Sequence, residues 1–101
     1  VRKGDVSVCL DVGHAHYSPE PMEKWFDVLG EYIQYMHLSD NMGRFDDHLP
    51  IGCGSIDWEN ANGLWKSLGR NMPATLEVGG IAGVEESLRF LRRNGCFGIE
   101  G

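Results

Sequence analysis

The chain has 101 residues, which is enough for at most one domain with a modest core. Hydrophobic residues make up 42% and charged residues 24%, ordinary values for a globular protein rather than a disordered one. The net charge of -6 argues against broad contact with nucleic acid or with an anionic membrane, because both require clustered Lys and Arg. The one basic cluster, "RFLRR" at 89–93, falls where a predicted helix ends, and there it suits the helix dipole.

Three cysteines, Cys9, Cys53 and Cys96, form an odd and irregularly spaced set, and no apolar run is long enough to span a membrane. We therefore expect free thiols in a reducing compartment, the cytoplasm. The chain begins with Val and runs straight into a strand-like segment. We expect residues 1–101 to be the C-terminal fragment of a longer domain.

The first predicted elements are a strand, a turn and a helix. Residues 5–11 are β-branched and apolar, which favours a buried strand. The segment 12–21 is interpreted as a turn, and the helix is predicted over 22–31, with Pro21 suited to its first turn. Its apolar stripe follows the i, i+3, i+4, i+7 pattern at Met22, Trp25, Phe26 and Leu29.

The second cycle repeats this order with a much longer loop. A strand is predicted over 32–38 and a helix over 57–69. Asp57 is a candidate N-cap and Gly69 a candidate stop for that helix. Between the two elements lies "SDNMGRFDDHLPIGCGSI", which is rich in glycine and in polar residues.

The third cycle consists of a strand over 74–78, the segment "GGIAG" and a helix over 84–95. That helix has acidic residues in its predicted first turn, arginines in its last turn and Asn94-Gly95 as a stop. Three strand–loop–helix cycles predict an α/β fold with parallel strands and right-handed crossovers. Because a parallel sheet must be covered on both faces or closed into a barrel, three such units form an incomplete architecture.

Polar residues stand at the end of every predicted strand. Asp11 and His14 follow the first strand, His37 ends the second, and Glu77 lies near the end of the third. The carboxyl ends of parallel strands form the active-site face of α/β proteins, so these side chains should gather on one rim. A single carboxylate after a strand is more often a helix cap, and a single His is more often a hydrogen-bonded core residue. Their shared position in three cycles favours a metal or catalytic site.

Two carboxylates and an imidazole form a mixed oxygen and nitrogen ligand set. Such a set suits Mn, Mg, Co, Fe or Zn better than a thiolate centre does. A carbonyl bound to the same ion would acidify the neighbouring C–H, and Glu77 is placed to move that proton.

The segments "CLDVGHAH", "YMHLSDN", "DDHLPIGCGSIDW" and "TLEV" together resemble the xylose isomerase-like barrel superfamily, which includes sugar-phosphate isomerases and epimerases and endonuclease IV. The resemblance runs from about residue 5 to 94. It implies a partial (β/α)8 TIM barrel in which the three units correspond to strands six to eight. The first five units, roughly 150 residues of such a barrel, would lie outside this chain.

The resemblance also implies roles for individual residues. Asp11, His37 and Glu77 match three of the four ligands of one divalent ion, and the fourth, a glutamate, lies outside the chain. Glu77 would be one of two acid/base glutamates. His14 matches a catalytic residue that contacts substrate or, in the endonuclease branch, a second zinc.

Asp46 and His48 match a D-x-H pair that binds a further zinc in the endonuclease branch, although many isomerase-like relatives keep it. His16 is interpreted either as a polar loop residue or as a substrate contact. We do not expect Cys53 to be catalytic, and we expect Trp58 to pack under the loop. We also expect Asp40 and Asp47 to be loop hydrogen-bonding residues.

The function predicted from the resemblance is a metal-dependent isomerase or epimerase acting on a sugar or sugar phosphate, with proton transfer through a metal-stabilised enediolate. The cofactor would be a divalent ion, Mn, Mg, Co or Zn. The alternatives are a metal-dependent endonuclease of the endonuclease IV type, another barrel lyase or dehydratase, and a non-catalytic fragment that self-associates. The expected partners are a small sugar and either a second copy or the missing barrel half. Nucleic acid and membrane are not expected partners.

Overall fold

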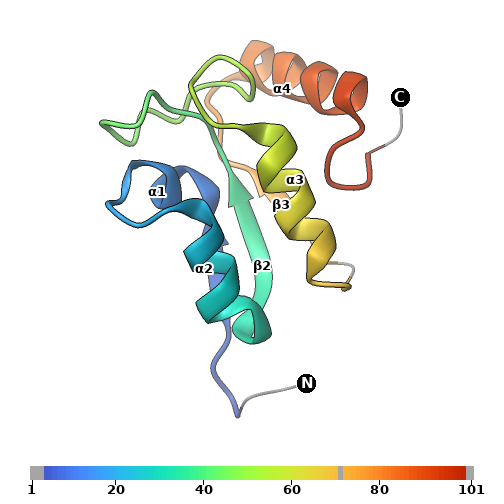
Figure 1. The fold of residues 1–101 in the computed structure, drawn as a ribbon. Coiled ribbons are helices and arrows are strands. Elements are labelled where there is room, and N and C mark those ends of the chain that lie inside the picture. The colour runs from blue at the N-terminus through green and yellow to red at the C-terminus, as the bar shows by residue number, and fades with distance from the viewer. Residues whose placement is uncertain (1–3, 71, 100–101) are drawn as a thin grey trace.

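The computed structural model describes residues 4–70 and 72–99. It contains three strands, β1 (Val8–Asp11), β2 (Ile33–Leu38) and β3 (Ala74–Leu76), in one sheet of order β1-β2-β3. Both strand pairs are parallel, so the predicted α/β arrangement with parallel strands is confirmed. Four α-helices and one 3-10 turn connect the strands, and Figure 1 shows α2 and α3 lying across one side of β2.

The helices are α1 (Val12–Tyr17), α2 (Met22–Leu29), α3 (Trp58–Ser67) and α4 (Ile81–Asn94), and the 3-10 turn η1 covers Gly30–Tyr32. The three predicted helices are confirmed, but the turn expected over 12–21 is wrong in part. Its first six residues form α1, which Asp11 caps by accepting a hydrogen bond from the His14 amide at 3.0 Å. A side-chain cap directly after a strand lets a helix begin without a connecting loop.

The predicted start of α3 and the predicted stop of α4 agree with the structure, whereas the predicted start of α4 does not. Asp57 caps α3 through the amide of Asn60, and Gly95 closes α4 in the left-handed conformation, both as predicted. Helix α4, however, begins at Ile81, three residues earlier than expected, so its first turn contains no acidic residue. Gly80, at φ 77, makes the sharp entry into the helix possible.

Strand β1 begins at Val8 rather than at residue 5, and its register shifts between Val8 and Cys9. Beyond this shift the pairing is regular, and Leu10 lies opposite Met36 while Asp11 lies opposite His37. Alternation along the strands then assigns the two sets to opposite faces of the sheet. The set containing Leu10 and Met36 is buried, and the set containing Asp11 and His37 is partly exposed.

The core lies between the sheet and the helices. The buried hydrophobic cluster draws on every helix, on two strands and on the loop after β2, and includes Val12, Phe26, Ile33, Met36, Ile51, Trp58, Ala61 and Leu91. Among the described residues, no helix covers the opposite face, where Cys9, Tyr35 and Thr75 are exposed. The three cysteines are unpaired, as expected, while the reducing compartment stays a prediction. Within the described residues, no helix has both the length and the apolar composition that crossing a membrane requires.

Candidate functional site

The candidate site lies at the carboxyl ends of the three strands. Asp11 is the last residue of β1, and His37 lies beside it in β2. His37 pairs with Thr75 of β3, and Glu77 follows two residues later, so alternation directs its side chain to the same face. The predicted gathering of these three side chains on one rim agrees with this register.

His37 and Glu77 contact each other directly. The His37 Nδ1 atom lies 3.4 Å from Oε1 of Glu77, and the two side chains are 35% and 41% exposed. The ring of Tyr35, two residues earlier on the same face, packs edge-on against His37 with centroids 5.5 Å apart. Tyr35 also contacts the hydroxyl of Thr75 on the next strand. This side-chain row orients the imidazole at the strand end.

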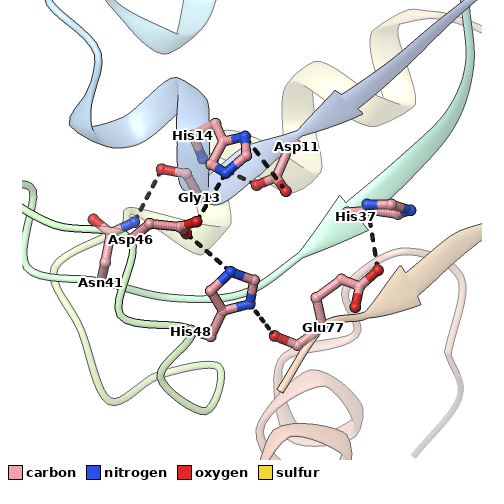
Figure 2. A network of polar contacts seen from close by, with 8 residues as sticks. All are labelled: Asp11, Gly13, His14, His37, Asn41, Asp46, His48 and Glu77. Atoms are coloured by element: carbon pink, nitrogen blue, oxygen red, sulfur yellow. Dashed lines mark hydrogen bonds and ion pairs between the residues drawn. The ribbon is translucent and has the colours of Figure 1, made fainter. Parts of the chain in front are cut away.

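A second set of contacts joins the loops that follow the strands, as Figure 2 shows. Asp46 Oδ2 lies 2.9 Å from His14 Nε2, and Asp46 Oδ1 lies 3.1 Å from His48 Nε2. His48 Nδ1 donates to the backbone carbonyl of Glu77 at 2.7 Å. The segments after β1, β2 and β3 are therefore linked through one carboxylate and two imidazoles.

These contacts shift the pKa values of Asp46 and His48, the two site residues on the loop after β2. Desolvation would raise the pKa of the Asp46 carboxyl, but hydrogen bonds and charge from His14 and His48 outweigh it and lower that pKa. The hydrogen bond to the Glu77 carbonyl raises the pKa of His48, desolvation opposes this change, and Asp46 adds to it. Both effects favour an ionised Asp46 beside a protonated His48.

His48 also has an unusual backbone, with φ at 53 in the left-handed region. A residue other than glycine is uncommon there, and its surroundings must hold it in place. The contacts of its two ring nitrogens with Asp46 and the Glu77 carbonyl provide this restraint.

The donor types fit a divalent ion, whereas the present side-chain directions do not converge on one point. Within the described part of the chain, no three His, Cys, Asp or Glu side chains are grouped so that they could hold a metal ion as they stand. Carboxylate and imidazole donors at neighbouring strand ends match the ligands that such ions prefer. Coordination would require the His37–Glu77 and His14–Asp46 contacts to open. The Nδ1 of His48 is bound to a carbonyl, an arrangement that leaves Nε2 as the ligand atom in metal sites.

Several other residues singled out in the sequence have structural partners. His16 Nε2 lies 2.8 Å from the Ser55 hydroxyl, which favours the polar loop interpretation. The Cys53 thiol donates to Glu86 at 3.2 Å, and this hydrogen bond raises the pKa of Cys53, so a reactive thiolate is disfavoured. Trp58 is buried under the loop, as expected.

The sequence reasoning missed one connection of the loop after β2. Asn41 is fully buried and donates to the Gly13 carbonyl at 2.9 Å, which ties this loop to α1. Asp40 is a loop hydrogen-bonding residue, as expected, and its carboxylate accepts four hydrogen bonds, although its full burial was not predicted. The only sequence signal for the role of Asn41 was an Asp-Asn pair shortly after a strand, followed by a glycine-rich loop.

Comparison with known proteins identifies the family to which the chain belongs. The xylose isomerase-like TIM barrel family matches residues 1–94, and the chain belongs to this family. A solved D-tagatose 3-epimerase-like protein is similar to the chain, with a TM-score of 0.82 and 25% identity over 92% of this chain and 36% of that one. The fold is thus an open three-stranded part of a TIM-barrel-like epimerase fold.

Two curated relatives represent the range of matches. An uncharacterised protein of Methanocaldococcus jannaschii is 35% identical over 57 residues, covering 56% of this chain and 22% of the relative. A probable endonuclease 4 of Protochlamydia amoebophila is 32% identical over 104 residues, covering 86% of this chain and 37% of the relative. The chain spans between 22% and 37% of the length of the curated relatives it matches.

Proposed function

We propose that the chain supplies metal-binding and proton-transfer groups to an isomerase or epimerase that acts on a sugar or sugar phosphate. The observation that carries this proposal is the placement of Asp11, His37 and Glu77 at the ends of three adjacent strands, on the same face. The similarity to a D-tagatose 3-epimerase-like protein supports the choice of substrate class.

In this proposal Asp11, His37 and Glu77 would hold a divalent ion, Mn, Mg, Co or Zn. When bound, the ion would polarise a substrate carbonyl and make the neighbouring C–H more acidic. The Glu77 carboxylate, which lies beside His37 at the strand ends, would accept that proton and return it. His14 would contact the substrate from α1.

Binding of Mn²⁺ tests the ligand assignment. Isothermal titration of the wild-type chain should give a saturable heat, and His37→Ala should weaken binding about tenfold or more. His16→Ala is the matched control, because His16 contacts Ser55 and lies outside the proposed ligand set. Equal heats for the two variants would contradict the assignment.

The chemistry has a separate test. Wild-type chain with Mn²⁺ should catalyse exchange of a ketohexose carbon-bound proton with deuterated water, measured by NMR, and Glu77→Gln should abolish the exchange. Wild-type chain without exchange, although Mn²⁺ binds, would contradict proton transfer by this chain and leave the ligand assignment standing.

The second candidate function is cleavage of DNA at abasic sites. Its support is the identity with a probable endonuclease 4 and the contact of Asp46 with both His14 and His48, the residues proposed to hold further zinc ions. The charge of the rim disfavours it, because the segments 12–21, 39–57 and 77–80 contain one Arg and no Lys. Cleavage of an abasic-site duplex in the presence of Zn²⁺ would reverse this ranking.

We also propose that the chain, in a reducing cytoplasm, pairs with a second copy. The open face of the sheet and the two edge strands, β1 and β3, support this proposal, because such features favour association. Sedimentation velocity should show a concentration-dependent increase in mass. A stable monomer with cooperative unfolding would contradict it.

A further inference from the structure

The carboxylate of Asp40 is fully buried and, among the described residues, has no basic partner. Its Oδ1 accepts hydrogen bonds from the amides of Asn41 at 2.9 Å and Ile56 at 3.2 Å. Its Oδ2 accepts from the Gly52 amide at 3.0 Å and from the indole Nε1 of Trp58 at 2.8 Å. A buried charge is expensive without compensation, so these four donors together must stabilise it.

The backbone of Asp40 holds a different part of the same loop. Its amide donates to the Leu49 carbonyl at 2.9 Å, and the Leu49 amide donates back at 2.8 Å. This antiparallel bridge closes the base of the segment 41–48. One residue therefore fixes the start of the segment, its end and the turn that follows.

The segment 41–48 contains both loop residues of the candidate site. From this segment, whose base the bridge closes, Asp46 contacts His14 and His48 contacts the Glu77 carbonyl. We propose that Asp40 is a positioning residue, whose buried carboxylate holds the loop so that Asp46 and His48 face the strand ends. This inference rests on the proposed function, since it assigns Asp40 a role in building that site.

The negative charge is the property that the arrangement requires. Each carboxylate oxygen of Asp40 faces two N–H donors. An asparagine of almost the same volume would direct its NH₂ group against two of them and would leave those donors unpaired. Asp40→Asn is therefore a test of hydrogen bonding at nearly constant shape.

The experiment combines amide hydrogen exchange with NMR of the imidazole nitrogens. In Asp40→Asn, the NH₂ group should oppose either the Gly52 amide, which donates to Oδ2, or the Ile56 amide, which donates to Oδ1. The opposed amide should exchange about ten- to hundredfold faster, as expected for loss of a hydrogen bond to a charged group. The ¹⁵N shifts of His14 and His48 should move toward those of solvent-exposed imidazoles. Asp57→Asn is the matched control, because asparagine also caps helices and neither readout should change.

Faster exchange at Gly52 or at Ile56 with unchanged His14 and His48 shifts would overturn the proposal, because Asp40 would then stabilise the loop without positioning the site. If Asp40→Asn does not fold, Trp58→Phe removes one of the four donors and should cause smaller changes in the same direction. Absence of those changes in a folded Trp58→Phe would also overturn it. Neither readout uses metal or substrate, so failure here is distinguishable from failure of the Mn²⁺ titration.

Discussion

The two faces of the sheet differ although they are built from alternate residues of the same strands. Leu10 and Met36 are 2% and 0% exposed and pack into the core. On the other face, Cys9, Tyr35 and Thr75 are exposed. Asp11 is the last residue of β1 at the rim, and His37 lies opposite it, one residue before the end of β2. The comparison teaches that the covered face stabilises this part of the chain, while the open face carries the side chains that could bind a metal ion or transfer a proton.

The largest effect expected from this comparison is the loss of a core side chain. Met36→Ala should lower the free energy of unfolding by about 2–5 kcal/mol, because it removes a fully buried side chain and leaves a cavity. At a dilution where the chain is monomeric, Tyr35→Ala, one residue earlier and 37% exposed, should lower it by about 1 kcal/mol or less. Chemical denaturation measures both values.

Met36→Ala and Tyr35→Ala also test whether the open face of the sheet is free or covered by a second copy. If a second copy covers the open face, Tyr35→Ala should cost as much as Met36→Ala, and its cost should grow with protein concentration. Equal costs at all concentrations would instead show that the open face is buried within a single chain.

An intermediate loss of stability is expected at Gly54, which lies in the loop after β2 against the buried carboxylate of Asp40. A Cβ at Gly54 would lie 2.3 Å from Oδ1 of Asp40, so Gly54→Ala should destabilise the fold by about 1–3 kcal/mol through overpacking. Gly63 in α3 is the matched control, since no neighbouring atom lies within 4 Å of its Cβ position. Gly63→Ala should stabilise the fold by up to about 1 kcal/mol. Equal changes in stability for Gly54→Ala and Gly63→Ala would contradict the close approach of Gly54 to the Asp40 carboxylate.

The smallest effect on stability is expected from the partly exposed pair Asp46 and His48, and it depends on pH. The raised pKa of His48 adds stability that is complete below its ordinary value of 6.5 and is lost as the pH rises through the raised value. The lowered pKa of Asp46 adds stability that is complete above 3.8 and is lost as the pH falls through the lowered value. The pair should therefore stabilise the loop most between pH 3.8 and 6.5.

Asp46→Asn should remove the acidic part of this pH dependence, because the titrating carboxyl is lost. It should only weaken the basic part, because the hydrogen bond to the Glu77 carbonyl, the largest cause of the raised pKa of His48, remains. Because both side chains are about a third exposed, the loss at pH 5 should be only about 0.5–1 kcal/mol. Unfolding free energies of wild type and variant, measured from pH 3 to pH 9, check it. A difference that is constant over this range would contradict an ionic interaction between Asp46 and His48.

The periodicity of apolar residues and the residues typical of helix caps and stops predicted the main helices from the sequence. The apolar stripe beginning at Met22, the Asp57 cap and the Gly95 stop predicted helices that the structure confirms. Helix α1 was missed because its six residues, "VGHAHY", have no helical stripe and only one strong helix former, Ala15. Its formation depends on the Asp11 cap and on burial of Val12 and Ala15, which are tertiary effects.

The sequence by itself determined three repeated units and the presence of Asp11, His37 and Glu77 at strand ends, because both follow from local pattern and from chain order. Only the tertiary structure decided that Asp11 lies opposite His37 and that Asp46 connects His14 with His48. It also decided that Asp40, one of four similar aspartates between residues 37 and 58, is the buried one. Burial and hydrogen-bond partners depend on segments far apart along the chain, and no local pattern contains them.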